Sequence, residues 1–324
     1  MVKISSKSGS MAGYTVRLGD SVNPRSMGGK GAGLSALVAA GFPVPEGFVV
    51  TAEAYRDFVE AAGLTGAGPE RLHATISGIP VPERIAGPIL AAYADLGSPP
   101  VAVRSSGTAE DLPGASFAGQ HDTYLGVSGA EAVLVAVRDC WASLWTPRAV
   151  AYRRRSSWDE RGLALAVVVQ RMVDADWAGV MFTADPVSGR RDRIVVEAVR
   201  GLGEALVSGA TTGRQCVIDK VSRKAVSGES AVPGGALAEL VRLGLEAEKR
   251  FARPQDIEWT YADGHCVLVQ SRPLTALPDE PVDTPSTRAP RKRGIDFSVT
   301  ADHMPYPPFP MDVSLVFRPI VRAL

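Results

Sequence analysis

The sequence predicts a protein that mixes α-helices and β-strands and is long enough for two domains or for one domain of two lobes. Its 324 residues are 45% hydrophobic and 22% charged, so the chain can bury a sizeable core. Apolar residues recur with helical spacing at residues 34–38, 52–62 and 130–144, whereas residues 163–218 are rich in strand patterns. A β-hairpin is predicted over residues 256–272, DIEWTYADGHCVLVQSR.

The charge balance excludes some classes of partner. Lys plus Arg and Asp plus Glu each number 35, so no basic field attracts nucleic acid or an anionic membrane surface.

No apolar run is long enough to span a bilayer, and the N-terminal residues lack the apolar segment of a signal peptide. Three separated cysteines without metal-ligand spacing fit buried thiols in a reducing compartment. We expect a cytoplasmic protein whose residues 1–13 are disordered.

A glycine-rich segment, Gly28–Gly33, precedes a helical pattern at Leu34 and Leu37. A glycine turn that runs into a helix exposes N–H groups at the positive end of the helix dipole, which is a natural anion site. Lys30 adds a full charge there. The segment lacks Walker A spacing, and no strand precedes it as in a dinucleotide fold. A simple helix cap explains the same residues equally well.

A second basic group follows a short buried strand, Val101–Val103. Arg104 at its end is well placed for a phosphate. Residues 114–125 are rich in small side chains and could close over a polyphosphate through their backbone N–H groups. The alternatives are an ion pair of Arg104 with Glu110 or Asp111, and glycines that serve only as turns.

Residues 163–172 form a nearly continuous apolar run that Gln170 and Arg171 interrupt, which predicts a buried strand ending in a hinge. The hinge backbone could read an adenine base, and Glu197 on a later strand could accept ribose hydroxyls. Further strands are expected over residues 178–185, 193–199 and 212–218, and a helix over 237–251.

Loop length decides which side chains of the hairpin share a face. A three-residue loop, Ala262–Gly264, pairs Asp256 with Gln270 and Glu258 with Leu268, and it puts a glycine at the left-handed position. A two-residue loop would mix apolar and polar side chains on both faces, so the sequence favours the longer loop.

The longer loop separates an apolar face from a polar one. The apolar face carries Ile257, Trp259, Val267 and Val269, and the polar face carries Asp256, Glu258, Gln270 and Arg272. Carboxylate and amide oxygens are ligands that Mg²⁺ prefers, and an adjacent arginine can hold a phosphate oxygen. A solvated sheet face with one ion pair is the alternative.

Beyond the hairpin, residues 278–295 predict a linker, and residues 296–324 the start of a following domain.

Eight motifs occur in a defined order: GGKGAGL, GFPVPEGFVVT, VRSSGTAED, GASFAGQHDTYLGV, GVMFTADPVSG, GLGEALVSG, PQDIEW and LVQSRP. Together they resemble the ATP-binding domain of the phosphoenolpyruvate synthase and pyruvate phosphate dikinase superfamily. Within it the layout is most similar to the rifampicin phosphotransferases. The resemblance implies an α+β, ATP-grasp fold over residues 14–277, with lobes of about 14–162 and 163–277 and the nucleotide between them.

The resemblance also implies roles for individual residues. Lys30, Arg104 and Arg272 would bind the phosphates and serve phosphoryl transfer. The covering loop, the adenine pocket and the ribose contact would be supplied by Gly119, Gln120, Thr123, Gln170, Met172 and Glu197. Glu258 and Gln270 would hold Mg²⁺, with Asp256 nearby. In place of the glutamine often found after Gln120, this chain has His121.

Members of this superfamily cleave ATP to AMP and pass the β-phosphoryl group to a histidine on a swivelling domain, and then to an acceptor such as pyruvate or a rifamycin. None of the four histidines of this chain lies in the Thr-Ser-His-Ala-type loop of that domain. The resemblance therefore implies an ATP-binding part that works with a phosphohistidine-bearing domain or protein in trans and a small-molecule acceptor. The alternatives are a direct small-molecule kinase that forms ADP and a catalytically silent nucleotide-binding module.

Overall fold

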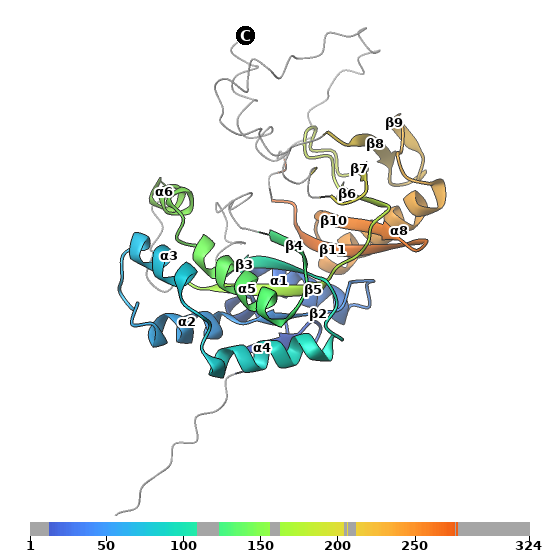
Figure 1. The fold of residues 1–324 in the computed structure, drawn as a ribbon. Coiled ribbons are helices and arrows are strands. Elements are labelled where there is room, and N and C mark those ends of the chain that lie inside the picture. The colour runs from blue at the N-terminus through green and yellow to red at the C-terminus, as the bar shows by residue number, and fades with distance from the viewer. Residues whose placement is uncertain are drawn as a thin grey trace, which may run out of the picture. The chain divides into compact units, whose positions relative to one another are not determined.

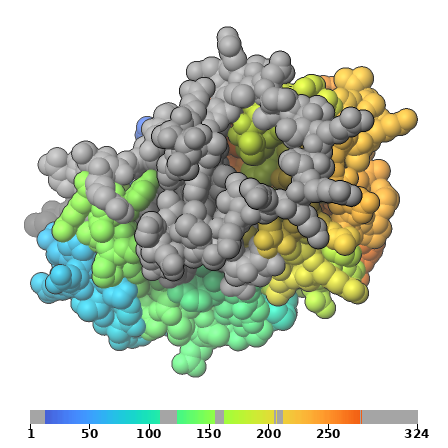
Figure 2. All heavy atoms as spheres, turned by 90° about the horizontal axis from the view of Figure 1, so that it is seen from above, coloured from blue at the N-terminus to red at the C-terminus, as the bar shows by residue number. Residues whose placement is uncertain are grey.

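The computed structural model describes residues 13–108, 123–155, 163–203, 206, 212–275 and 277. Figures 1 and 2 draw the other residues in grey. The chain divides into two compact units: one holds Met1–Ala39 and Pro45–Met172, and the other holds Ala40–Val44 and Val173–Leu324. Among the described residues, the first unit combines six helices with one sheet and the second combines helix α8 (Gly234–Phe251) with another, which confirms the α+β prediction. The division falls after Met172, later than the lobe boundary expected at residue 162.

A five-stranded antiparallel sheet forms the centre of the first unit, in the order β1-β2-β5-β3-β4. Its strands are β1 (Thr15–Arg17), β2 (Gly47–Val50), β3 (Val101–Gly107), β4 (Thr123–Val127) and β5 (Leu165–Arg171). The central strand β5 is the predicted buried strand, and Val167, Val168 and Val169 have no exposed surface. Burial on both sides explains why it reads as a continuous apolar run.

Helices cover both faces of this sheet (Figure 1). They are α1 (Pro24–Ala39), α2 (Ala52–Ala61), α3 (Pro69–Gly78), α4 (Glu83–Asp95), α5 (Ala130–Ser143) and α6 (Pro147–Arg155). The main core packs α2 to α5 against one face, with the rings of Phe58 and Trp141 centred 5.0 Å apart. Helix α1 lies on the other face, where Gly31 approaches Val49 so closely that an added methyl group would lie 3.1 Å from it.

Helix α1 runs through the glycine-rich segment instead of beginning after it. Its one residue with non-helical dihedral angles is Gly28, with φ 68° and ψ 174°. The predicted glycine turn is therefore wrong for residues 29–33, which are helical. Burial of Gly31 and Ala32, with Gly31 lying against Val49 of β2, overrides the low helix propensity of glycine. A second helical segment begins after the break at Gly28, so a helix N-terminus still lies just before Lys30.

The second unit contains a six-stranded antiparallel sheet in the order β11-β10-β6-β7-β8-β9. Its strands are β6 (Trp177–Phe182), β7 (Arg193–Arg200), β8 (Arg214–Asp219), β9 (Ala225–Gly228), β10 (Gln255–Ala262) and β11 (His265–Pro273). Helix α8 (Gly234–Phe251) covers one face, where Gly244 lies against Met181 (Figure 1). The opposite face carries Phe182 and Val195 in a smaller apolar cluster. At the outer edge, the N–H of Leu268 on β11 donates to the carbonyl of Pro43, 2.8 Å away.

Strands β10 and β11 form the predicted hairpin, but its loop has two residues and not three. Ala262 pairs with His265, and Asp263 and Gly264 both have positive φ, 52° and 83°. Two successive positive φ values are the mark of a type I′ turn, whose twist matches that of the flanking strands. The residue that the short loop leaves over, Val269, is accommodated by a β-bulge on β11.

The bulge produces the predicted polar face although the predicted pairs are wrong. Glu258 pairs with Gln270, and Asp256 pairs with Arg272. Directly paired residues of antiparallel strands point to the same side of the sheet. All four polar side chains therefore share one face, as expected.

The apolar face differs from the prediction in its β11 residues. Trp259 pairs with Leu268, and both are buried, as is Cys266. Val267 and Val269, which were expected there, are only partly buried. The two-residue loop shifts β11 by one position between the turn and the bulge, and this exchanges the faces of its side chains.

The three cysteines are buried free thiols, as the sequence predicts. Burial, aided by Glu239, raises the pKa of the Cys266 thiol to about 12. Within the described ranges, no helix combines the length and the hydropathy needed to cross a membrane.

Gly179 on β6 offers a test of the second unit's packing. A Cβ added there would lie 2.0 Å from the carbonyl oxygen of Glu197 and 2.8 Å from the ring of Trp259. We expect Gly179→Ala to lower the free energy of unfolding by about 2 kcal/mol or more, because a strand backbone and a buried ring must shift. Urea unfolding followed by tryptophan fluorescence measures this. Gly235→Ala, at a site with open space on α8, is the control, and equal losses in both variants would contradict the packing.

Candidate functional site

Predicted nucleotide-binding residues of the first unit share one face of its sheet. Arg104 on β3 pairs with Thr123 on β4 and with Val168 on β5. Gln170 lies two residues beyond Val168 and so points to the same side. Thr123 is exposed and Arg104 is partly buried. The strands therefore present three of the predicted side chains to one region.

Lys30 lies on α1, which packs against the same face. The Ser106 hydroxyl donates to the carbonyl of Met27, 2.8 Å away, and accepts the N–H of Gly31 at 3.1 Å. Ser106 is two residues from Arg104 on β3, so both point to the side that α1 covers. The helix turn that carries Lys30 is thus fixed to the strand that carries Arg104. A lysine on this helix turn and an arginine on the adjoining strand can bind an anion such as a phosphate.

The predicted hinge at Gln170 and Met172 is held by hydrogen bonds. Gln170 is 2% exposed, and its side-chain amide donates to the carbonyl of Pro45, 3.1 Å away. The N–H of Met172, the last residue of the first unit, donates to the carbonyl of Pro100 at 2.9 Å. An adenine contact at this strand end would use carbonyl oxygens or side chains rather than these N–H groups.

Three predicted residues of the second unit lie in one row across its sheet. Gln270 pairs with Glu258, Glu258 with Val180, and Val180 with Glu197. Gln215 continues the row on β8. The row lies on the face opposite α8, because paired residues share a side and the neighbouring Met181 faces α8. An amide and two carboxylates are thereby aligned on one surface.

The Glu197 carboxylate is oriented by the main chain. Its Oε1 accepts the N–H of Gly213 at 2.9 Å. The side chain is partly buried on the row face. A carboxylate fixed in this way can accept hydrogen bonds from the hydroxyl groups of a sugar.

Asp256 and Arg272 form an ion pair in the adjacent row. The Nε of Arg272 donates to Oδ2 of Asp256 at 2.9 Å, and Asp256 is 6% exposed. Burial raises the pKa of Asp256, while the Arg272 charge acts in the opposite direction. The pair fixes the direction of the Arg272 guanidinium group, on a side chain that is 33% exposed. The contact that the structure shows for the Asp256 carboxylate is thus the one that orients Arg272.

The donor set fits Mg²⁺ under one condition. Within the part of the chain that the structure describes, no three His, Cys, Asp or Glu side chains gather into a group that could hold a metal ion. Glu258 and Gln270 provide one carboxylate and one amide oxygen on adjacent strands. Mg²⁺ often takes one or two protein oxygens and completes its shell with phosphate oxygens and water. The pair fits a magnesium ion that arrives with a phosphate ligand.

Some predicted residues cannot be placed. Gly119 and Gln120 of the covering loop lie outside the described residues, and so does His121. The predicted linker, residues 278–295, and the predicted start of a following domain, residues 296–324, also lie outside them.

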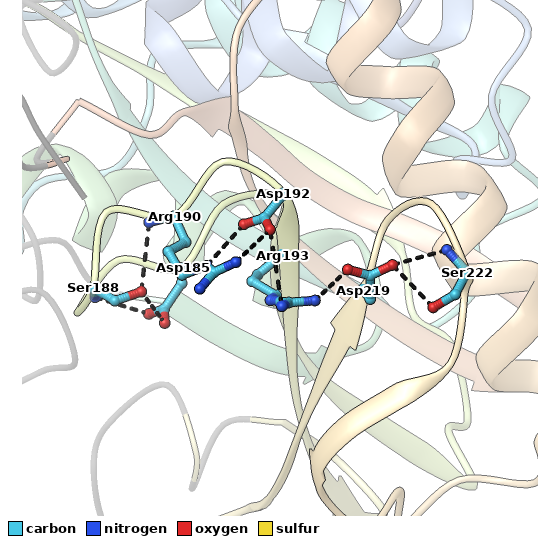
Figure 3. Close-up of polar contacts among 7 residues, drawn as sticks. All are labelled: Asp185, Ser188, Arg190, Asp192, Arg193, Asp219 and Ser222. Atoms are coloured by element: carbon cyan, nitrogen blue, oxygen red, sulfur yellow. Dashed lines mark hydrogen bonds and ion pairs between the residues drawn. The ribbon is translucent and has the colours of Figure 1, made fainter. Parts of the chain in front are cut away.

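The motif GVMFTADPVSG ends in a polar turn whose sequence predicts no contact with the nucleotide. Asp185 accepts the N–H of Val187 at 2.9 Å and the hydroxyl of Ser188 at 2.5 Å. Figure 3 shows the contacts that continue from there, through Arg190, Asp192, Arg193 and Asp219 to Ser222. They tie the turn after β6 to the turn after β8. The end of the motif therefore joins a chain of polar contacts between two turns of the sheet that carries the row.

A cavity of about 390 Å³ opens at another part of this sheet. Trp177, Arg200 and Arg214 are among its lining residues, and none of the predicted site residues is. Both arginines are exposed to solvent. Exposed guanidinium groups beside a shallow cavity are ordinary surface features, so the row is the better candidate site.

Comparison with known proteins gives the family. The model of the pyruvate phosphate dikinase AMP/ATP-binding domain matches residues 24–234 and 229–293. These ranges contain every residue predicted for the site.

Curated relatives agree. A rifampicin phosphotransferase from Streptomyces sviceus is 43% identical over 78% of this chain and 34% of its own length. A probable phosphoenolpyruvate synthase from Methanocaldococcus jannaschii is 39% identical over 77% of this chain and 25% of its own length. Another, from Methanothermobacter thermautotrophicus, is 40% identical, with 79% and 45% covered. The chain thus spans between a quarter and a little under half of these relatives.

Solved structures overlap with the whole chain only weakly. D-alanine–D-alanine ligase from Bacillus anthracis gives a TM-score of 0.31 at 9% identity, over 78% of this chain and 58% of that one. A value this low supports no fold assignment, whereas the match of the family model covers most of the chain. The chain therefore belongs to the pyruvate phosphate dikinase AMP/ATP-binding domain family.

Proposed function

We propose that this chain binds Mg-ATP and acts as the phosphoryl-donor part of a dikinase-type phosphotransferase with an ATP-grasp fold. The observation that carries the proposal is the pairing of Glu258 with Gln270 on one sheet face, in a chain of an AMP/ATP-binding family. Oxygen donors in this arrangement suit a magnesium nucleotide better than a free metal ion.

The phosphates are assigned to the basic groups. Phosphoryl transfer depends mainly on positioning and on neutralising charge, with little covalent chemistry from the protein. Lys30, Arg104 and Arg272 would supply the positive charge, and the ion pair with Asp256 orients Arg272. Mg²⁺ held by Glu258 and Gln270 would neutralise phosphate oxygens.

The remaining predicted residues are assigned to the rest of the nucleotide. Gln170 and Met172 would contact the adenine, and Glu197 would accept the ribose hydroxyls. Gly119, Gln120 and Thr123 would belong to a loop that covers the phosphates. The exposed position of Thr123 beside Arg104 supports its part in this assignment.

The acceptor of the first transfer is proposed to be a histidine on another domain or chain. The β-phosphoryl group would move from ATP to a histidine nitrogen, AMP would leave, and the γ-phosphoryl group would pass to a second acceptor such as water. Relatives named phosphoenolpyruvate synthase and rifampicin phosphotransferase support a small-molecule final acceptor such as pyruvate or a rifamycin.

Lys30→Ala and Glu258→Ala should each weaken Mg-ATP binding by about ten- to a hundredfold without unfolding the protein, because each removes a contact to a charged group. Isothermal calorimetry measures the affinity, and circular dichroism checks the fold. The exposed Lys224 and Glu246 provide matched controls as alanine variants. Unchanged affinity in both site variants would contradict the assignment.

Gln270→Leu should raise the Mg²⁺ concentration needed for half-maximal ATP binding by about tenfold, because an oxygen ligand is replaced by a side chain of similar size. The titration is run at fixed ATP concentration. Gln215→Leu makes the same change at the other end of the row and should leave the Mg²⁺ midpoint unchanged. Equal midpoints in the parent and in Gln270→Leu would exclude Gln270 as a ligand.

Nucleotide products distinguish the proposed reaction from its alternatives. With Mg-ATP, we expect AMP and phosphohistidine only when a histidine-bearing domain from a rifampicin phosphotransferase is added, and neither when its histidine is replaced by alanine. Chromatography of the nucleotides gives the answer. ADP together with a phosphorylated small molecule would indicate a direct kinase, and binding without turnover in every pairing would indicate a silent module.

A further inference from the structure

Ser106 makes two hydrogen bonds across a large sequence separation. It lies on β3 and has no exposed surface. Its hydroxyl donates to the carbonyl of Met27 and accepts the N–H of Gly31, which are 79 and 75 residues away in the sequence. These two main-chain groups lie on either side of the break in α1. One hydroxyl group therefore binds both ends of the interrupted helix turn.

The break is shaped to receive this hydroxyl. Gly28 has φ 68°, a value that side chains rarely allow, and a Cβ there would lie 2.2 Å from the Ser106 carbonyl oxygen and 2.3 Å from its Oγ. The helix backbone thus lies directly against the strand. A hydroxyl group is needed because the site requires a donor and an acceptor in one small side chain.

The turn that Ser106 fixes is the one that carries Lys30. Lys30 lies between Gly28 and Gly31, so its main chain is bounded on both sides by contacts to Ser106. Arg104 lies two residues from Ser106 on the same strand and on the same side of the sheet. One serine thereby sets the place of the lysine relative to the arginine.

We propose that Ser106 is a positioning residue for phosphate binding, which holds the Lys30 turn of α1 against β3 beside Arg104. The inference rests on the proposed function, since it assumes that Lys30 binds the phosphates of ATP. Ser106 is buried and acts through the main chain around Lys30, without touching the nucleotide itself.

The first experiment measures, without any nucleotide, how firmly Ser106 fixes the turn of α1 that carries Lys30. Hydrogen–deuterium exchange is followed in the full chain, in Ser106→Ala and in Ser105→Ala. Ser105 is the matched control, because it is also buried but points to the opposite side of β3. We expect exchange over residues 27–33 to be at least about tenfold faster in Ser106→Ala alone, because the Gly31 N–H loses its acceptor. Unchanged exchange there would overturn the proposal.

The second experiment tests whether Ser106 affects nucleotide binding through Lys30. Ser106→Ala should weaken Mg-ATP binding by about tenfold in the parent, and by much less when Lys30 is already alanine, because the two changes act on one contact. A purely structural role would give the same loss in both backgrounds and would overturn the proposal. If Lys30→Ala itself leaves the affinity unchanged, the proposed function fails. The exchange experiment then still shows whether Ser106 fixes the helix turn.

A shape-matched pair keeps the test valid if Ser106→Ala does not fold. Thr and Val at position 106 differ only by a hydroxyl in place of a methyl group. We expect Ser106→Thr to keep the slow exchange over residues 27–33 and Ser106→Val to lose it. Equal exchange in these two variants would show that the hydroxyl does not hold the turn.

Discussion

The antiparallel register of one hairpin determines which side chains of the second unit can act together. A type I′ turn closes the hairpin with two residues, and a bulge at Val269 then takes up the residue left over. Beyond the bulge, Glu258 and Gln270 are paired. Without it, β11 would present its opposite set of side chains to the row, because a shift of one residue reverses the faces. The chemistry assigned to this sheet depends on that single inserted residue.

In the first unit, packing of α1 on the sheet face determines where the basic residues lie. A strand residue, Ser106, binds the main chain of α1 at its break, and the same strand carries Arg104. The glycines of α1 permit this close approach, since Gly31 lies against Val49 and Gly28 against Ser106 itself. Rigid elements thus carry both basic residues, Lys30 on α1 and Arg104 on β3. This arrangement is expected where charge must be held in a defined place.

Much of this could be predicted from the sequence, where a local pattern determines the structure. The apolar run around Val167–Val169 predicts the central strand, and the alternation around Glu258 predicts its polar face. The loop length was predicted wrongly because a clean alternation can arise from a long loop or from a short loop with a bulge. The helix through Gly31 was missed because tertiary packing outweighs local propensity. The contact of Ser106 with Met27 joins residues that are distant in the sequence, and no short-range pattern records such a pair.

The small segment Ala40–Val44 has a consequence for how the molecule can be divided. It belongs to the second unit, where the Pro43 carbonyl accepts the N–H of Leu268 on the edge strand β11. The polypeptide therefore passes from one unit to the other after Ala39, returns after Val44, and passes over again after Met172. A protease that cut only at the last of these points would give two polypeptides, and the first of them would still carry Ala40–Val44, which belongs to the second unit. Neither unit corresponds to an uninterrupted stretch of the gene, so swapping one of them between relatives requires exchanging two separate pieces of coding sequence.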